Sequence, residues 1–431
     1  MVSTISHFRN CESIETMTNL DGMVRALRPV LLCLAVAVPA VALRVTGVHP
    51  AAPLAIMVFG LGVVAASFVL AWAAEAAELD ISGGLAIALL AVIAVLPEYA
   101  VDLYFAHTAG SQPEYVQYAA ANMTGSNRLL LGLGWSSVVL VSLYVASRRS
   151  GRSVRSLVLD SGYRRELGFL SIAGVVAFVI PLTGQIHLVL GIALLAFFAY
   201  YLWRAAASEH GDEPELIGPA ARIGALPKVQ RRLTVVAMFA LAAGVILAAA
   251  EPFADSLVEG GHALGIDQFL LVQWLAPLAS EAPEFIIALL FAWRGKGAAA
   301  LGLLISAKVN QWTLLIGSLP IAYGIGGGPA ALQLDGRQVE EFLLTATQTL
   351  LGIAILLTLR FPRWAAWTLL GLFAVQFAVP GQTGRYVLCG VYAALALATF
   401  VHHRREILPT LAEPFRRTKQ AEQRSDELIG V

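Results

Sequence analysis

The chain carries the same acidic motif twice inside apolar sequence. One copy, at 96–106, reads LPEYAVDLYFA, and the other, at 282–292, reads APEFIIALLFA. Glu98 and Glu284 therefore each follow a proline and precede an aromatic residue. A carboxylate at mid-membrane depth is costly, and its recurrence beside a proline in both halves of a chain indicates an ion site in an inverted-repeat transporter. The pattern predicts a membrane cation transporter.

The composition fits a chain whose main solvent is lipid. Hydrophobic residues make up 58% of the sequence and charged residues 13%, whereas an ordinary soluble domain is about one quarter charged. We expect an all-α polytopic membrane protein with about 12 transmembrane helices of about 20 residues each. The predicted spans are 29–47, 53–77, 83–107, 115–145, 167–183, 186–204, 233–257, 267–293, 297–323, 339–359, 364–379 and 385–402.

The basic residues predict the orientation in the membrane. Loops after even-numbered spans and both termini hold nearly all of them, with Arg337 and Arg385 as exceptions. Cytoplasmic loops are enriched in Lys and Arg, so we expect both termini in the cytoplasm and the protein in the cell (inner) membrane. The formal net charge is zero, which gives no reason to expect nucleic acid. The expected partners are the lipid bilayer and inorganic cations, and the oligomeric state is open.

The duplication extends to whole groups of helices. One helix after each motif, Asn127 begins NRLLLGLG and Asn310 begins NQWTLLIG. If the second span answers the seventh, the offset of five helices is odd, and the second copy crosses the membrane in the opposite direction. The expected organisation is an N-terminal segment with an extra helix (1–52), a first repeat half (53–205), a cytoplasmic linker (206–232), a second repeat half (233–380), and an extra helix with a charged cytoplasmic tail (381–431).

Pro97 and Pro283 are predicted to kink or break their helices, because proline removes a backbone donor and clashes with the carbonyl four residues earlier. A break at the midplane frees carbonyl oxygens, which suit a hard cation such as sodium or calcium. We therefore expect Glu98 and Glu284 to be metal ligands at one central site. The alternative is that each carboxylate snorkels to a helix end or pairs with a basic group.

These motifs resemble those of the calcium/cation antiporter superfamily (sodium/calcium exchanger membrane region family), over roughly 55–145 and 240–325. Its two alpha-repeats carry a Gly-Thr-Ser-Leu-Pro-Glu-like motif, followed one helix later by a Gly-Asn-x-x-Gly-Ser-Asn-like motif. The stretch 96–98 fits the end of the first motif, and 121–127 fits the second except at its first glycine. In the second repeat Ser280 keeps a hydroxyl at the threonine position and Glu281 replaces the serine, while 306–310 departs strongly. The resemblance implies ten core helices in two inverted halves, the motif glutamates as central ion ligands, and alternating access.

Further polar residues in the apolar spans are candidates for the same ion site. Asp102 shares a helix face with Glu98, and Glu281 shares one with Glu284, so each could extend an acidic path or serve a structural pair. Close carboxylates repel one another, which makes proton exchange reasonable. Neutral oxygens, which could instead hydrogen-bond between helices, are offered by Asn122, Ser126, Asn127, Ser306 and Asn310. The alignment leaves open whether Ser306 and Asn310 answer the first repeat's serine and asparagine, or Asn310 alone answers Asn127.

Lys308 and Arg128 are basic residues deep in predicted spans. An ammonium in a carboxylate site acts as a tethered cation that occupies one ion position. The alternative is that both simply neutralise Glu281 or Asp102. In either role the basic residues reduce the negative charge left for free cations, so we expect fewer than four bound ions.

The leading hypothesis is a secondary antiporter that exchanges calcium or sodium against another cation. A sodium/proton exchanger is the runner-up, because the two basic residues remove negative charge that a divalent ion needs. A receptor or scaffold that has lost transport is a third possibility. An enzyme is not expected, because His107, His187 and His262 fall at span ends and no nucleotide-binding loop appears. No cofactor is expected beyond the transported sodium, calcium or protons.

Overall fold

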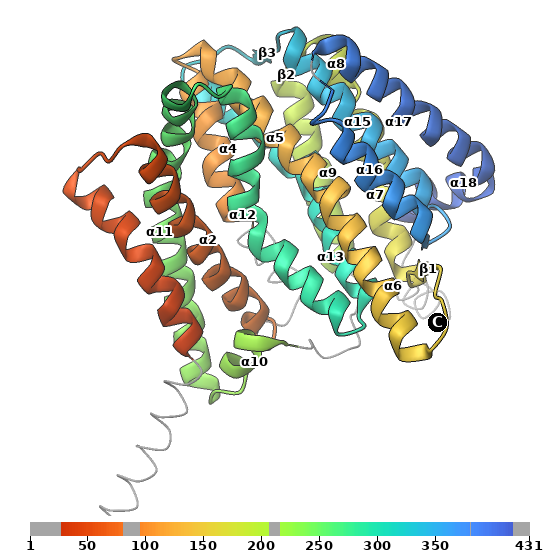
Figure 1. Ribbon diagram of the computed structural model, residues 1–431, viewed down its shortest axis with the longest axis horizontal. Helices are drawn as coiled ribbons and strands as arrows, with labels where there is room; N and C mark the ends of the chain where they lie inside the picture. Colours follow the sequence, from red (N-terminus) through yellow and green to blue (C-terminus); the bar gives the residue numbers. More distant parts are fainter. Residues whose placement is uncertain (1–26, 81–94, 207–215, 380, 417–431) are drawn as a thin grey trace, which may run out of the picture.

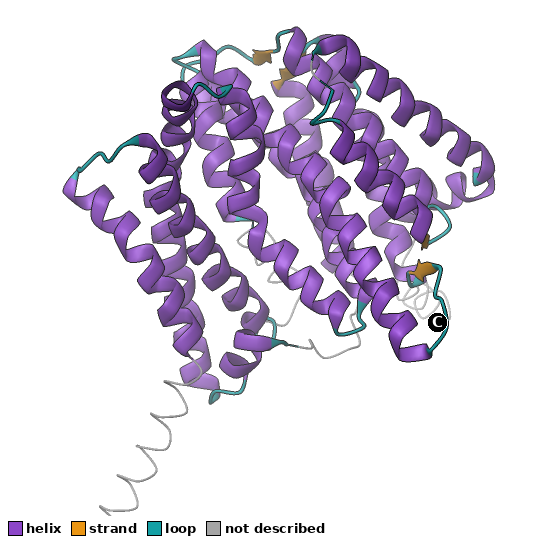
Figure 2. Ribbon diagram, in the orientation of Figure 1, coloured by secondary structure: helices purple, strands orange, loops and turns teal. Residues whose placement is uncertain are grey.

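A computed structural model describes residues 27–80, 95–206, 216–379 and 381–416. The described residues form a bundle of long helices, and the strands are short segments near the helix ends (Figure 2). Three helices, Leu27–Thr46, α2 (Ala52–Ala77) and α11 (Lys228–Leu264), stand together at one side of the bundle (Figure 1). The other helices form a larger group beside them.

The first half of the bundle contains the elements that follow α2. They are α4 (Leu96–Ala109), α5 (Val116–Leu129), a π-helical segment (Leu130–Trp135), α6 (Ser136–Ser150), β1 (Ser156–Val158), α7 (Arg164–Val176), α8 (Val179–Thr183), β2 (Gln185–His187) and α9 (Leu188–Ala206). Short 3-10 turns at Pro113–Tyr115 and Ser161–Tyr163 precede α5 and α7.

The second half repeats the arrangement after the short helix α10 (Gly218–Gly224) and the long α11. Its elements are α12 (Gln268–Trp293), α13 (Gly297–Asn310), a π-helical segment (Gln311–Leu315), α14 (Ile316–Ile325), β3 (Ala331–Gln333), α15 (Gly336–Leu356), β4 (Arg360–Pro362) and α16 (Arg363–Val375). The chain continues through α17 (Gln382–His402), α18 (Arg404–Ala412) and a 3-10 turn (Glu413–Phe415).

Ten helices of the described residues are long and apolar enough to cross a membrane, and they coincide with ten of the predicted spans. The span predicted at 83–107 is described only from Val95 onward, and the one at 364–379 is the shorter apolar helix α16. The all-α polytopic architecture is therefore confirmed. The count of twelve stays a prediction.

The two motif prolines act differently on their helices. Pro97 lies in the first turn of α4, where a missing backbone donor costs nothing, and Val95 before it has a non-helical backbone. Pro283 lies inside α12 together with Pro277, and that helix continues through both, although its ribbon changes direction along its length (Figure 1). The expected kink or break is thus a helix start in the first repeat and a bent but continuous helix in the second.

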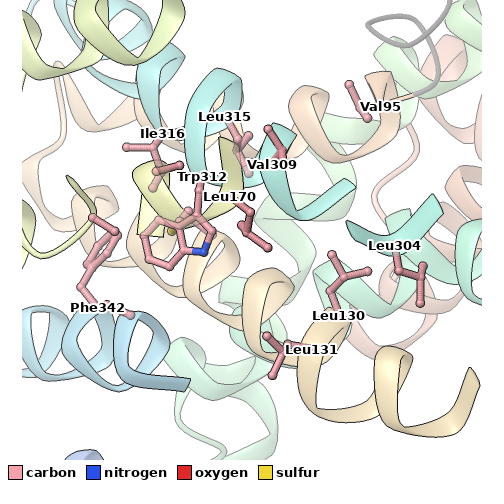
Figure 3. Packing of buried hydrophobic residues seen from close by; sticks show 14 of the residues in the cluster. Val95, Leu130, Leu131, Leu170, Leu304, Val309, Trp312, Leu315, Ile316 and Phe342 are labelled. Carbon is pink, nitrogen blue, oxygen red and sulfur yellow. The ribbon is translucent and has the colours of Figure 1, made fainter. Parts of the chain in front are cut away.

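Each repeat contains a π-helical segment shortly after its second motif. Leu130–Trp135 follows Asn127, and Gln311–Leu315 follows Asn310 directly. Trp135 and Trp312 lie in these segments and are almost completely buried. Figure 3 shows Trp312 among apolar side chains of the main core, and its indole Nε1 donates to Thr349 Oγ1 at 3.1 Å. Because π-turns often occur at functional sites, their presence in both repeats draws attention to the residues beside them.

Two small antiparallel pairings join the halves. β1 pairs with β4, with Leu157 opposite Phe361, and β2 pairs with β3, with Ile186 opposite Leu332. Phe361, Ile186 and Leu332 are almost fully buried. The connections before α7, α9, α15 and α16 are therefore tied across the two repeats.

An ion pair fixes the end of α2 to the start of α11. Arg231 Nε lies 2.7 Å from Asp80 Oδ2 and Arg231 Nη2 lies 2.9 Å from Oδ1, while Arg232 Nε approaches Oδ1 at 3.1 Å. The hydrogen bonds from Arg231, supported by Arg232, lower the pKa of Asp80 to about 2.

Asp80→Asn is expected to lower the melting temperature of the detergent-solubilised protein at neutral pH by a few degrees. A carboxyl with a lowered folded-state pKa stabilises the fold fully above its ordinary value of about 3.9 and loses that effect as the pH falls toward about 2. The difference between wild type and variant should therefore narrow in this window when melting is followed by intrinsic fluorescence. Asp160→Asn, at an exposed loop position, should change nothing. A difference that is constant across the window would contradict the assignment.

Candidate functional site

Two buried glutamates from opposite repeats meet at one serine. Glu98 lies in the first turn of α4 and is 6% exposed, and Glu281 lies on α12 and is 2% exposed. Ser126 on α5 brings its Oγ to 2.5 Å from Glu98 Oε1 and is also in short hydrogen-bond contact with Glu281 Oε1. Each repeat thus contributes one carboxylate to the same point.

Gln311, the first residue of the second π-helical segment, completes this group. Its Nε2 lies 2.6 Å from Glu281 Oε1, 2.8 Å from Ser126 Oγ and 3.2 Å from Glu98 Oε1. We call Glu98, Ser126, Glu281 and Gln311 the central cluster. Two carboxylates this close, shielded from water, are stable only when a proton or a cation neutralises part of their charge.

The hydrogens in the central cluster do not suffice for its contacts. A serine hydroxyl has one hydrogen, so Ser126 can donate to Glu98 or to Glu281 but not to both at once. The other contact needs a proton on the carboxyl group or a cation between the oxygens. The cluster can therefore hold either a proton or a cation, and the chemistry it offers is hard oxygen ligation.

Glu284 lies one turn beyond Glu281 on α12 and is half-buried. It makes no hydrogen bond to another described residue, but it is within electrostatic reach of both Glu98 and Glu281. The two glutamates of the Pro-Glu motifs therefore face the same region, while the direct partner of Glu98 is Glu281.

Lys308 on α13 is completely buried beside the central cluster. Its Nζ donates to the backbone carbonyl of Asn127 at 2.5 Å and lies 5.9 Å from the centre of the Trp312 ring. It interacts electrostatically with Glu281 and Glu98 but forms no ion pair within 4.0 Å in the part of the chain that is described. The ammonium is thus held by a neutral carbonyl at the edge of the carboxylates.

The two asparagines of the second motifs have unequal surroundings. Asn310 Oδ1 accepts from the hydroxyl of Tyr99 at 2.8 Å, directly beside Glu98. Asn127 donates to Met123 O at 3.1 Å, and its Oδ1 is buried without a hydrogen bond. The residue that answers Tyr99 in the second repeat is Phe285, which has no hydroxyl. Asn127 Oδ1 therefore remains available as a neutral oxygen ligand.

Arg128 points away from the central cluster. Its Nη2 lies 2.5 Å from Glu341 Oε2 on α15, and both side chains are fully buried. Its Nη1 donates to Gln376 Oε1 at 3.2 Å, and the guanidinium lies 5.2 Å from the centre of the Trp274 ring. The expectation that Arg128 neutralises Glu281 or Asp102 is therefore wrong, because Glu341 lies closer and satisfies the charge.

The remaining candidates lie around the cluster rather than in it. Asp102 and Asn122 are fully buried and close to each other, but their side-chain oxygens and nitrogen have no hydrogen-bond partner in the described structure. Ser280 donates back to Ala276 O at 3.1 Å. Ser306 faces Tyr201 of α9. The structure therefore brings together Glu98, Ser126 and Glu281, places Lys308, Asn127, Asn310 and Glu284 beside them, and leaves Ser306 outside.

Sequence reasoning missed the roles of Gln311 and Glu341. Gln311 stands next to Asn310 in an apolar stretch, and Glu341 stands at the start of a predicted span. Both could have been found as polar groups inside helices that have little water to solvate them.

No trio of His, Cys, Asp or Glu in the described residues is arranged to hold a metal ion by itself, so a cation here would rely partly on neutral oxygens.

A close crossing of α5 and α12 holds the cluster together. A Cβ placed on Gly125 would lie 1.8 Å from the backbone oxygen of Gln273. That oxygen is the carbonyl four residues before Pro277, which has no N–H to donate to it. Gly125 and Pro277 thus let the two helices approach, and Ser126 beside the glycine reaches Glu281.

Comparison with known proteins gives the family. A family model described as sodium/calcium exchanger protein matches residues 51–206 and 234–380. The chain belongs to the sodium/calcium exchanger family. This family comprises membrane exchangers of cations, so the two matched segments are its two repeats. No curated protein matches the chain.

Solved structures of exchangers resemble this one. The crystal structure of the H+/Ca2+ exchanger CAX is 41% identical with a TM-score of 0.85, and the match covers 91% of this chain and 98% of that one. Native YfkE is 18% identical with a TM-score of 0.57 and coverages of 84% and 100%. The sodium-calcium exchanger NCX_Mj, soaked with Na+ and Sr2+, is 17% identical with a TM-score of 0.50 and coverages of 77% and 100%. The last two likenesses show a shared fold.

Gly125→Ala is expected to destabilise the exchanger by about 1–3 kcal/mol, because the added methyl group overlaps Gln273 and pushes α5 away from α12. The same displacement separates Ser126 from Glu281, so ion transport should be lost in the fraction that still folds. Thermal melting and flux in proteoliposomes would measure the two effects. Gly244→Ala on α11, where a Cβ meets no atom within 4 Å, is the matched control. Equal behaviour of the two variants would contradict the role given to the crossing.

Proposed function

We propose that this exchanger moves calcium across the membrane against protons, by alternating access to the central cluster. The observation that carries the proposal is the contact of Ser126 with both Glu98 and Glu281, which one hydroxyl hydrogen cannot satisfy. The missing positive charge can be supplied by a cation between the carboxylates or by a proton on one of them, and the two exclude each other. Exchange of one for the other follows from that exclusion.

The charges around the cluster favour a divalent cation. Glu98, Glu281 and Glu284 are within electrostatic reach of one another, and Lys308 faces the first two. Asp102 is fully buried and forms no ion pair with another described residue, so we assign it a proton. Three carboxylates and one ammonium leave two negative charges, which match calcium. Glutamate and amide oxygens are ligands that calcium accepts in a flexible shell.

Protons are the natural counter-ion of such a site. When calcium leaves, two buried carboxylates would face each other unneutralised, which costs far more than binding a proton. The cluster would therefore return across the membrane in a protonated state. The similarity to the H+/Ca2+ exchanger CAX, at 41% identity over nearly the whole chain, supports the same pair of ions.

Sodium/proton exchange is a second candidate, and Lys308 is the observation that favours it. A lysine buried beside the carboxylates already occupies one cation's worth of charge. If Glu284, which has no hydrogen bond in the described structure, is protonated during transport, one negative charge remains and a monovalent ion suffices.

The orientation completes the proposal. We place both termini in the cytoplasm and the protein in the cell membrane, because the basic loops lie on one face of the predicted topology. Calcium would then be extruded when protons flow inward.

Calcium uptake into proteoliposomes is expected to follow an imposed pH gradient, with sodium absent on both sides. Glu281→Gln should abolish this flux, because it removes one of the two charges that meet at Ser126. Calcium-sensitive and pH-sensitive dyes would record both ions in parallel. Glu259→Gln, at an exposed position of α11, is the control and should transport normally. Proton movement with sodium but without calcium would replace the proposal by the second candidate, and binding without any flux would point to a receptor.

Lys308→Met is expected to tighten calcium binding by roughly tenfold, because it raises the net negative charge beside the ion. Turnover should fall, since a more tightly held ion is released more slowly. Isothermal titration calorimetry and the flux assay would separate the two effects, and Lys228→Met at the exposed start of α11 is the control. Weaker or unchanged calcium binding would show that Lys308 does not contribute its charge to the site.

A further inference from the structure

A second group of buried charges lies behind the central cluster. Arg128 pairs with Glu341 at 2.5 Å, and Arg385 from α17 also hydrogen-bonds to Glu341 and lies 3.6 Å from Glu340. Arg128 and Glu341 are fully buried and Glu340 nearly so. The two positive and two negative charges cancel, and we call these four residues the paired group.

The paired group adjoins the ion site through one peptide bond. Lys308 donates to the carbonyl of Asn127, and that carbonyl belongs to the peptide group that continues into Arg128. Lys308 and Arg128 are close enough to repel each other electrostatically. Because Lys308 also faces Glu281 and Glu98, a positive charge on Arg128 lies close enough to act on these carboxylates as well. The charge of Arg128 is therefore kept from the site by its partner and not by distance.

The contacts of Arg128 show which partner does this. Gln376 and Trp274 orient the guanidinium but carry no charge. Of the two glutamates, Glu341 contacts both arginines, whereas no ion pair between Glu340 and Arg128 appears among the described residues. Removal of the Glu341 charge would leave Arg128 as a second tethered cation beside Lys308.

We infer that Glu341 determines the valence of the transported ion. By neutralising Arg128, it leaves the carboxylate site with two net negative charges, which suit a divalent cation. Without it the site would have one net negative charge, which suits a monovalent cation. Glu341 does not touch the ion, so it is a specificity-determining residue that acts through Arg128. This inference rests on the proposed function.

A change of charge can be told apart from a loss of structure, because it affects calcium and sodium binding to different extents. The Coulomb energy of an ion is proportional to its charge, so a change of one unit at a fixed position affects calcium twice as strongly as sodium. Glu341→Gln should therefore weaken calcium binding by roughly tenfold or more. The factor for calcium should be about the square of the factor for sodium.

The test measures calcium and sodium dissociation constants of the full-length purified protein by calorimetry. Four proteins are compared: wild type, Glu341→Gln, the double variant Arg128→Gln with Glu341→Gln, and Glu341→Asp. The double variant removes both charges and should return the calcium constant to within about threefold of wild type. Glu341→Asp keeps the charge and should do the same. Melting temperatures, measured in parallel, report on the fold.

The outcomes separate the inference from the proposal beneath it. If wild type binds no calcium, the proposed function is wrong. If wild type binds calcium and Glu341→Gln binds it equally well, Glu341 does not set the charge of the site. If the double variant binds calcium as weakly as Glu341→Gln, or both ions are weakened by the same factor, the effect is structural and the inference is overturned. If Glu341→Gln does not fold, Arg128→Gln decides instead: it leaves one more negative charge on the paired group, so it must tighten calcium binding, and unchanged binding overturns the inference.

Discussion

The structure depends on keeping two glutamates close together where water cannot neutralise them. Glu98 and Glu281 share the hydroxyl of Ser126, and a proton or a cation must offset their repulsion. Several features of the fold serve this contact. Pro97 lets α4 begin beside Glu98, and Gly125 lets α5 approach α12. Gln311, at the start of the second π-helical segment, donates to both carboxylates. The cost of burying the charges favours binding of a proton or a cation at this point.

The two repeats are similar in fold but differ in chemistry. Tyr99 pairs with Asn310, while Phe285 leaves Asn127 Oδ1 without a partner. The residue after Asn310 is Gln311, which enters the central cluster, and the residue after Asn127 is Arg128, which leaves it for Glu341. Each repeat therefore supplies a different part of one site.

The sequence predicted the fold and part of the site, because both are written in local patterns. Apolar spans and the duplicated Pro-Glu motifs need no tertiary information, and they led to Glu98 and, through its helix face with Glu284, to Glu281. Ser126 was named because 121–127 resembles a motif of the family. The partners of Arg128 and Ser306 could not be predicted, since they lie on α15 and α9, far away in the chain. The role of Gln311 was not foreseen because a glutamine in an apolar span can also serve packing between helices, and its partners Glu98, Ser126 and Glu281 lie on α4, α5 and α12.

Buried basic residues in a cation site have consequences that depend on their partners. Lys308 donates to a neutral carbonyl and forms no ion pair within 4.0 Å among the described residues, so no close carboxylate cancels its charge. Arg128 has a carboxylate at 2.5 Å. Outside the immediate surroundings of this ion pair, the two opposite charges therefore act only as a dipole. In the proposed charge count, Lys308 therefore contributes to the site and Arg128 does not, although both were equally conspicuous in the sequence. The net charge that an ion meets is therefore set by which cations are already paired, and that is a property of the packing of α5 against α15.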